Sequence, residues 1–459
     1  TGIFGKWHLG DNYPSRPEDR GFSETFIHGG GGIGQTPDFW GNDYFDDTYR
    51  HNGSLEQASG YCTKVFFDKA LAFIAKNRRQ PFFCYLPTNV PHSPYNVPKR
   101  YSRPYLNQGA PGSMANFYGM ITEFDENLGR LMDSLDRLGI TENTILIFLT
   151  DNGTAAGVWH PRGTRQTSPS WSGFNANMRG SKGSHFDGGH RVPCFIRWPA
   201  AGIGGGRDVE RLTAHIDVIP TLAELCGLPL PENLDGRSLV PLLHGRSQDW
   251  PDRTLYVHHQ REELPPKWIR SAVMSERWRL IDGTQLYDIQ TDPGQAHDIS
   301  ARHSEVVRKL RAKYEKWWQS HASRRQQYAW IKLGSPHENP THLTCHDWHQ
   351  PDTSKIPWNQ THIEQGMESN GYWMVEFTQG GRYQFTLRQK PAVANEAIAA
   401  NKAVLWIGNR EFSAEIPAGA SEVTLTMEIT AGQKRMQTRF TDDTTGQARG
   451  AYFVEISLL

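Results

Sequence analysis

Two short motifs near the start of the chain combine a lysine and two histidines with flanking glycines or prolines. In Gly5-Lys6-Trp7-His8-Leu9-Gly10, an ammonium and an imidazole lie two residues apart. An extended loop would place Lys6 and His8 on one side, which suits an oxyanion and a proton carrier. In Pro91-His92-Ser93-Pro94, the prolines fix the backbone around His92, which follows a predicted strand and could project from the ligand-binding end of a sheet. Each motif alone also fits an ordinary surface loop.

Two further motifs offer oxygen ligands and a second ammonium. Asp151 and Asn152 end a predicted strand, and their carboxylate and amide oxygens are hard donors suited to Ca²⁺ or Mg²⁺. An Asx-type turn that ends the strand would explain the same two residues. In the segment 178–183, glycines around Lys182 would let backbone and ammonium approach an anion closely, although the spacing of a phosphate-binding P-loop is absent. The segment DGGHRVP that follows is interpreted as mainly structural, with Asp187 bracing the loop.

Alternating strand and helix patterns must position these motifs. Continuous apolar runs at 82–86, 144–150 and 192–198 are typical of strands buried on both faces, as in parallel sheets. Apolar residues at helical spacing predict helices at 64–77, 114–138, 215–226 and 301–320. The first part of the chain is therefore predicted to be α/β, with a largely parallel sheet flanked by helices.

After Pro336 the apolar residues alternate with a period of two, as in Tyr383, Phe385 and Leu387. This pattern predicts a core at 1–335 and a separate β-sandwich-like accessory domain at 340–459. The accessory domain contains four tryptophans that either pack in its core or help to dock a glycan, namely Trp348, Trp358, Trp373 and Trp406.

Charge and hydropathy exclude two classes of partner. Lys+Arg and Asp+Glu are equal at 49 each in a chain of 459 residues. The basic excess of a general nucleic-acid or anionic-membrane binder is therefore absent, and any affinity for an anion must be local. No apolar run approaches the roughly 20 residues of a membrane span.

Taken together, the motifs resemble those of the sulfatase family, within the alkaline-phosphatase superfamily. GKWHLG, PHSP, LTDNG, RGSKG and DGGHRVP follow one another in that family's order, and Leu286-Tyr287-Asp288 with Asp292-Pro293 resembles the end of its core. The resemblance covers residues 1–325. It implies an alkaline-phosphatase-like fold and hydrolysis of sulfate esters, either aryl sulfates or sulfated glycans. The run from Gly29 to Gly34 would help to shape the substrate pocket.

The resemblance also implies a role for each matching side chain. In the family, a hydrated formylglycine attacks sulfur, and the sulfated diol then collapses to release sulfate. Lys6 would bind the sulfate oxygens, and His8 would take the proton of the diol. His92 and Lys182 would bind substrate at the bridging oxygen, with His92 as the proton donor. These cations would stabilise the charge that develops on the sulfuryl and leaving oxygens.

The resemblance assigns Asp151 and Asn152 to calcium, with magnesium as an alternative. The family places two more metal-binding Asp residues and a Cys/Ser-x-Pro-x-Arg element before GKWHLG, and neither occurs in this sequence. The nearest segment, Ser15-Arg16-Pro17-Glu18-Asp19, ends in Asp. Asp151 and Asn152 would supply about three of the 6–8 oxygens that calcium takes.

The formylglycine is therefore expected upstream of this chain, made by a formylglycine-generating enzyme. The chain as given is expected to be inactive, to bind metal poorly and to expose strand edges. The resemblance further implies a periplasmic or secreted location, which nothing in the chain itself reveals.

Two other functions stay open. A phosphomonoesterase or phosphonate hydrolase of the same superfamily would share the metal core, although GKWHLG with both Lys6 and Lys182 favours sulfate. A sulfatase-like binding protein without catalysis is the alternative from a different class, although nothing in residues 1–325 looks decayed.

Overall fold

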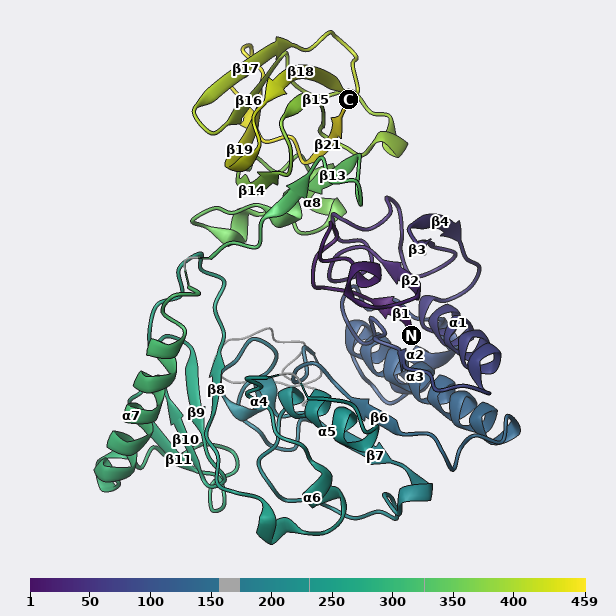
Figure 1. Ribbon diagram of the computed structural model, residues 1–459, viewed down its shortest axis with the longest axis vertical. Helices are drawn as coiled ribbons and strands as arrows, with labels where there is room; N and C mark the ends of the chain where they lie inside the picture. The colour runs from purple at the N-terminus through teal and green to yellow at the C-terminus, as the bar shows by residue number, and fades with distance from the viewer. Residues whose placement is uncertain (157–173, 231, 326) are drawn as a thin grey trace. The chain divides into compact units, whose positions relative to one another are not determined.

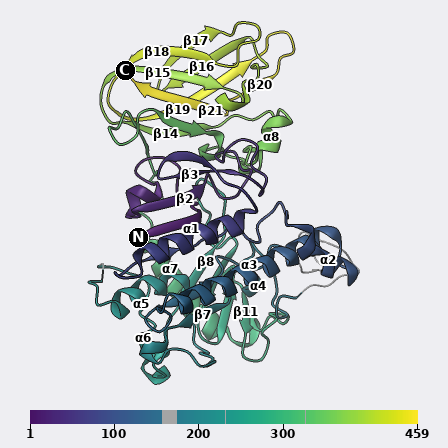
Figure 2. The same ribbon diagram turned by 90° about the vertical axis from the view of Figure 1, so that its right-hand side faces the viewer.

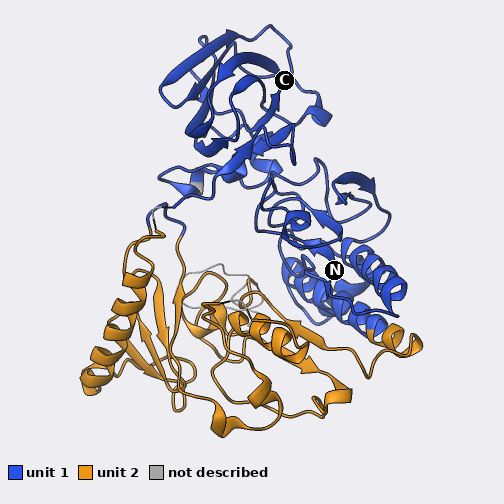
Figure 3. Ribbon diagram, in the orientation of Figure 1, with its two compact units in different colours: residues 1–131, 261–264, 326–459 blue, residues 132–260, 265–325 orange. Residues whose placement is uncertain are grey.

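Residues 1–156, 174–230, 232–325 and 327–459 are described by a computed structural model (Figure 1). Their contacts group into two compact units (Figure 3). Unit 1 consists of residues 1–131, 261–264 and 326–459, and unit 2 of residues 132–260 and 265–325. The domains predicted from sequence were divided near residue 335, where the spacing of apolar residues changes. These units are instead defined by contacts between residues.

The first sheet of unit 1 has the strand order β4-β3-β2-β1-β5. Its central strand β1 (Gly2–Lys6) runs parallel to β2 (Glu24–His28) and to β5 (Cys84–Tyr85). Strands β3 (Thr48–His51) and β4 (Ser54–Gln57) continue the sheet antiparallel to β2 and to each other.

Helix α1 (Cys62–Asn77) lies along this sheet (Figure 2). Phe73 packs on Phe4 of β1 and Phe66 on Phe26 of β2, with ring centroids 5.5 and 6.3 Å apart. The apolar spacing that predicted the helix is therefore the face that covers the sheet. Two further helices are α2 (Lys99–Asn107) and α3 (Gly112–Arg137).

Unit 2 contains two small sheets and several helices. Strand β6 (Leu146–Leu149) pairs with β7 (Cys194–Arg197). The second sheet has the order β11-β10-β9-β8, and α7 (Ser304–Ser320) packs on it through Leu310, Tyr314 and Trp318. The remaining elements of this unit are β8 (Leu255–His258), β9 (Ser271–Met274), β10 (Trp278–Ile281), β11 (Gln285–Asp288), α4 (Asp187–His190), α5 (Val218–Leu225) and α6 (Val240–Leu243).

The apolar runs form strands at the predicted places, but the surroundings of these strands differ from the prediction. Strands β6 and β7 pair antiparallel rather than parallel. Phe195 is 66% exposed, Phe83 just before β5 is 45% exposed, and Tyr85 within β5 is 44% exposed. An apolar run indicates that burial of the strand is favourable. It does not determine which other segment packs against the strand.

The C-terminal part of unit 1 is a β-sandwich, as the alternating pattern predicted. One sheet has the order β12-β14-β19-β16-β17 with β20 beside β19, and the other has the order β13-β21-β15-β18. Tyr383, Phe385 and Leu387 are fully buried between the sheets. The strands are β12 (Ile331–Leu333), β13 (Thr341–Thr344), β14 (Tyr372–Phe377), β15 (Gly381–Arg388), β16 (Lys402–Ile407), β17 (Arg410–Glu415), β18 (Val423–Ile429), β19 (Gly432–Thr441), β20 (Ala448–Arg449) and β21 (Phe453–Leu458), and one helix, α8 (Gln360–Glu364), precedes β14.

Two of the four tryptophans of this sandwich pack in its core, and two lie outside it. Trp348 and Trp373 are 4% and 0% exposed and belong to the core. Trp406 is half-buried and donates a hydrogen bond to Glu411. Trp358 is half-buried and lies outside the core, against His346.

Among the described residues, no helix combines the length and the apolar character that crossing a bilayer requires.

Candidate active site

Lys6 lies at the carboxyl end of the central strand of the first sheet. It pairs in register with His28 of the parallel strand β2. Its backbone N–H donates to the carbonyl of Pro87, 2.6 Å away, just after β5. Gly5 has a φ of 130°, and a Cβ there would come within 3.0 Å of the carbonyl carbon of Pro87. The glycine before Lys6 therefore allows the close approach that holds Lys6 at the end of the sheet where open α/β sheets bind ligands.

The glycine run lies against the imidazoles of both His8 and His92. A Cβ on Gly31 would overlap the His8 ring, coming within 2.6 Å of Nδ1. A Cβ on Gly32 would lie 3.4 Å from Nδ1 of His92. The structure thus gathers the two predicted histidines around one segment of backbone, and it gives the glycines a steric reason that the sequence alone did not.

His92 is oriented by hydrogen bonds that fix its tautomer. Its Nδ1 lies 2.7 Å from the carbonyl oxygen of Ser93, which can only accept, so Nδ1 carries the proton. The backbone N–H of His92 donates to the carbonyl of Asn89, and the hydroxyl of Tyr44 donates to the carbonyl of His92. With Nδ1 protonated, any proton exchange by this ring would take place at Nε2.

The surroundings of His8 keep its imidazole neutral. The side chain of His8 is exposed, yet partial desolvation together with the positive charge of Lys6 lowers its pKa from 6.5 to about 4. Burial also lowers the pKa of His28 to about 4. The negative charge of Asp11 opposes the lowering of the His8 pKa. The pKa of Asp11 itself is raised by burial, and the charge of Arg50 partly offsets this rise. A neutral His8 beside a cationic Lys6 can accept a proton next to a bound anion.

The β-sandwich contributes two residues to this cluster that the sequence analysis missed. The His346 ring centroid lies 6.0 Å from that of His8. Burial, together with the nearby Asp11 carboxylate, raises the pKa of Asp347 to about 7. No sequence motif marks His346 or Asp347, and they lie far along the chain from the motifs that were recognised.

One side chain, Gln360, fastens the β-sandwich to the loop after the glycine run. It is 7% exposed, and its Oε1 accepts from the backbone N–H of Gly41, 2.9 Å away. Its Nε2 donates to three carbonyl oxygens, those of Gln35, Asp38 and Phe39, at 3.1–3.3 Å. The amide is thus fully used within this loop.

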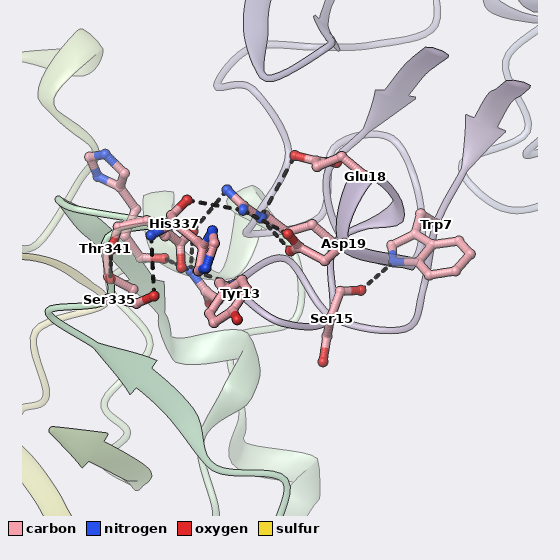
Figure 4. Close-up of polar contacts among 12 residues, drawn as sticks. Trp7, Tyr13, Ser15, Glu18, Asp19, Ser335, His337 and Thr341 are labelled. Carbon is pink, nitrogen blue, oxygen red and sulfur yellow. Dashed lines mark hydrogen bonds and ion pairs between the residues drawn. The ribbon is translucent and has the colours of Figure 1, made fainter. Parts of the chain in front are cut away.

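A second attachment joins the sandwich to the loop that follows His8 (Figure 4). The backbone N–H of Tyr13 donates to Oε2 of Glu338 at 2.9 Å, and the Tyr13 ring stacks on His337 at 4.8 Å. The side chain of Asn12 donates to the carbonyl of His342. Both loops that flank His8 are therefore held by the sandwich.

Asp151, Asn152 and Lys182 lie in unit 2, where two loops interlock. The backbone N–H of Lys182 donates to the carbonyl of Thr154 at 2.8 Å, and that of Gly153 donates to the carbonyl of Gly189 at 3.0 Å. A Cβ on Gly153 would come within 2.8 Å of the carbonyl carbon of Gly188. The predicted metal ligands and Lys182 are thus held in one pair of loops.

Asp187 braces these loops, as the sequence analysis suggested. Its Oδ1 accepts from Nε of Arg279 at 3.0 Å, and the two side chains are 1% and 5% exposed. Its backbone N–H donates to the side chain of Gln295. The guanidinium of Arg179 donates to the hydroxyl of Tyr287 at 3.1 Å, which gives the Leu286-Tyr287-Asp288 motif a structural role.

Asp151 and Asn152 have the donor chemistry for calcium but not the number of ligands. Asp151 is exposed and Asn152 half-buried. Within the part of the chain that the structure describes, no group of three or more His, Cys, Asp or Glu residues could hold a metal ion. The two oxygen donors fit a hard cation and would need further ligands to complete its shell.

Two family models match this chain. The sulfatase model matches residues 1–228, and the model of the C-terminal part of N-sulphoglucosamine sulphohydrolase matches residues 181–320. A steryl-sulfatase of Mus musculus is 36% identical over 193 residues, which are 41% of this chain and 28% of that protein. The N-acetylgalactosamine-6-O-sulfatase of Bacteroides thetaiotaomicron is 28% identical over 267 residues, which are 54% of this chain and 49% of that protein. The matched segments thus span about half, or less, of the length of these two relatives.

The fold is likewise similar to solved structures. The crystal structure of Ps i-CgsB in complex with k-i-k-neocarrahexaose matches with a TM-score of 0.59 and 26% identity, over 69% of this chain and 71% of that one. The predicted alkaline-phosphatase-like α/β fold with a C-terminal β-sandwich is confirmed. The matched residues include every motif on which the resemblance was based, and the chain belongs to the sulfatase family.

Proposed function

We propose that the protein containing this chain hydrolyses sulfate esters. The observation that carries the proposal is the cluster at the end of β1, where Lys6 ends the strand and a neutral His8 and His92 lie against the glycine run. A cation suits the sulfate oxygens, and two imidazoles suit the proton transfers of ester cleavage. Family membership supports sulfate rather than phosphate as the group transferred.

Each side chain then has a defined part in the reaction. Lys6 binds sulfate oxygens and offsets the negative charge that grows on them. In its doubly protonated form, His92 gives the proton on Nε2 to the bridging oxygen as the bond from sulfur to that oxygen breaks, and it keeps the proton on Nδ1 and becomes neutral. Lys182 stabilises the same oxygen. His8 then takes up a proton as sulfate is released. A formylglycine outside this sequence would supply the nucleophile, and a formylglycine-generating enzyme would make it.

Calcium is the proposed metal, held in part by Asp151 and Asn152. A bound divalent cation would polarise the bonds from sulfur to oxygen. Binding can be followed without turnover, because a ligand that binds only the folded protein raises the unfolding temperature. We expect calcium to raise the unfolding temperature of the upstream-extended protein, and to raise that of Asp151→Ala less. An equal shift in both proteins would remove Asp151 from the metal site.

The proposed substrate is a sulfated sugar. Two observations support it: one relative is named an N-acetylgalactosamine-6-O-sulfatase, and one similar structure was solved with a neocarrahexaose. Aryl sulfates would serve as general assay substrates. A periplasmic or secreted location would give such an enzyme access to extracellular glycans.

Release of nitrophenol from nitrophenyl sulfate and from nitrophenyl phosphate tests the proposal. The protein should be extended upstream of Thr1 and produced together with a formylglycine-generating enzyme. We expect turnover of the sulfate well above that of the phosphate, and loss of turnover in both His92→Ala and Lys182→Ala. Preferred turnover of the phosphate would indicate a phosphatase. Absence of turnover on aryl and sugar sulfates alike would favour a binding protein.

A further inference from the structure

We propose that His346 of the β-sandwich is a further substrate-binding residue, which contacts the alcohol part of the sulfate ester and selects esters of hydroxyl-rich alcohols such as sugars. The inference rests on the proposed function, because that function places the ester beside His8. The 6.0 Å separation of the two ring centroids brings anything bound at His8 within reach of His346.

The position of the His346 ring is fixed from two sides. The residue lies in a short 3-10 helix (Cys345–Asp347) directly after β13, and its backbone N–H donates to the hydroxyl of Thr344. Trp358 packs nearly perpendicular to the imidazole, with centroids 4.9 Å apart and an angle of 87°. The indole N–H of Trp358 is held in turn by the carbonyl of Thr353. A ring held in this way can form directional hydrogen bonds with little loss of conformational entropy.

The chemistry of His346 suits a hydroxyl group better than a sulfate. The imidazole is half-buried, and in the described ranges no hydrogen bond reaches either of its ring nitrogens. Burial lowers its pKa to about 4, so the ring is neutral and presents one donor and one acceptor. Sulfate oxygens only accept, and Lys6 already supplies a cation beside His8. A sugar hydroxyl both donates and accepts, which matches a neutral imidazole.

The β-sandwich is attached closely enough to keep His346 in this place. The sandwich holds the loop after His8 through Glu338, and it holds the loop after the glycine run through Gln360. Gln35 and Asn359 add an isolated antiparallel bridge between the same two regions. A glycan-docking module on a flexible linker would show no such contacts. This sandwich instead forms a side of the cluster around His8.

The test compares a substrate with hydroxyls to one without. In the upstream-extended protein, His346→Ala should lower kcat/KM for 6-sulfated N-acetylgalactosamine about fivefold to tenfold, the usual effect of losing one neutral hydrogen bond. Nitrophenyl sulfate has no hydroxyl to contact, so its kcat/KM should not change. His346→Asn keeps a donor and an acceptor and should restore part of the loss.

His349→Ala is the matched control. This histidine lies in the same segment and is also half-buried, but its ring stacks on Tyr372, 5.6 Å away. We expect His349→Ala to leave the ratio of the two substrates unchanged. An equal loss on both substrates in His346→Ala, or no loss on either, would overturn the inference.

Calorimetric binding of the same sulfated sugar separates this inference from the proposed function. If the wild-type protein binds the sugar more tightly than His346→Ala but turns over neither substrate, His346 contacts the sugar and the hydrolase proposal fails. Turnover of both substrates, with equal sugar affinity and equal kcat/KM in wild type and His346→Ala, leaves the hydrolase proposal standing and overturns the role of His346.

Discussion

The imidazole of His8 occupies the space where Gly31 would carry a side chain. A Cβ on Gly31 would overlap the ring, reaching within 2.6 Å of Nδ1. Gly31 belongs to the loop after β2, whereas His8 follows β1. The position of a proposed catalytic group is therefore set by the missing side chain of a residue on a neighbouring segment.

Replacing Gly31 with alanine should displace His8 without unfolding the protein. We expect kcat/KM for nitrophenyl sulfate to fall about a hundredfold, because displacements near 1 Å have effects of that size. Gly129→Ala is the control, since a Cβ on this exposed helical residue would meet nothing within 4 Å. That variant should keep full activity. An active Gly31→Ala protein with an unchanged pH profile would show that His8 does not need this position.

The buried carboxyl of Asp38 should make unit 1 less stable as the pH rises. Burial, together with the Asp47 carboxylate, raises its pKa from 3.8 to about 7. Between these two pH values the folded protein keeps a proton that the unfolded chain releases, so a higher pH favours unfolding. From about pH 5.5 to about pH 8, the free energy of unfolding should fall about 2 kcal/mol more in the wild type than in Asp38→Asn.

Urea unfolding at the two pH values measures this difference. Asp43→Asn, which changes an exposed carboxyl in the same loop, should show the same pH dependence as the wild type. Equal pH dependence in the wild type and in Asp38→Asn would mean that Asp38 is ionised in the folded protein throughout this range.

Gln360→Ala should loosen the loop of residues 35–41, which follows the glycine run. Three carbonyl oxygens and the N–H of Gly41 would lose their partner inside a buried region. Leaving buried polar groups unpaired should lower the free energy of unfolding by about 2–3 kcal/mol. Turnover should also fall, because a displaced Gly31 would no longer hold His8 in place. Gln365 is exposed and lies just after α8, the helix that contains Gln360. Gln365→Ala should therefore alter neither the free energy of unfolding nor turnover. Wild-type stability in Gln360→Ala would show that water replaces these contacts without cost.

In unit 2, Arg279→Met should be far more damaging than Arg277→Met. Arg279 pairs with Asp187 where both side chains are buried, whereas the Arg277 side chain that pairs with Asp288 is 49% exposed. Loss of a buried partner leaves an uncompensated charge and should cost about 3–5 kcal/mol, whereas loss of the exposed Arg277 guanidinium should cost much less. Chemical denaturation of both variants measures the difference. Similar losses would contradict the assigned role of Asp187 in bracing the loop of Lys182.

Sequence reasoning located the residues of the cluster more completely than its surroundings. Lys6, His8 and His92 could be singled out because they lie in short local motifs, and their roles in oxyanion binding and proton transfer stay predictions. Periodicity likewise located helix α1 and the β-sandwich, since burial on one face leaves a repeating pattern. Whether Asp151 and Asn152 bind calcium stays a prediction.

The sequence could not reveal which distant segments cover one another. His346 carries no motif, and its approach to His8 depends on contacts between loops far apart in the chain. Strand β7 was expected to be buried in a parallel sheet, but it pairs antiparallel with β6 and leaves Phe195 exposed. Pairing is a property of the whole fold, so a local apolar run cannot specify it.

The amide of Gln360 also limits how such a protein can be recombined. Its hydrogen bonds reach the backbone of residues 35–41 in the N-terminal part of the chain. A chimera that exchanged only the β-sandwich would give this loop a foreign partner, whereas one that exchanged loop and sandwich together would keep the match. Between related proteins, the length of the loop that corresponds to residues 35–41 and the residue at position 360 should therefore change together.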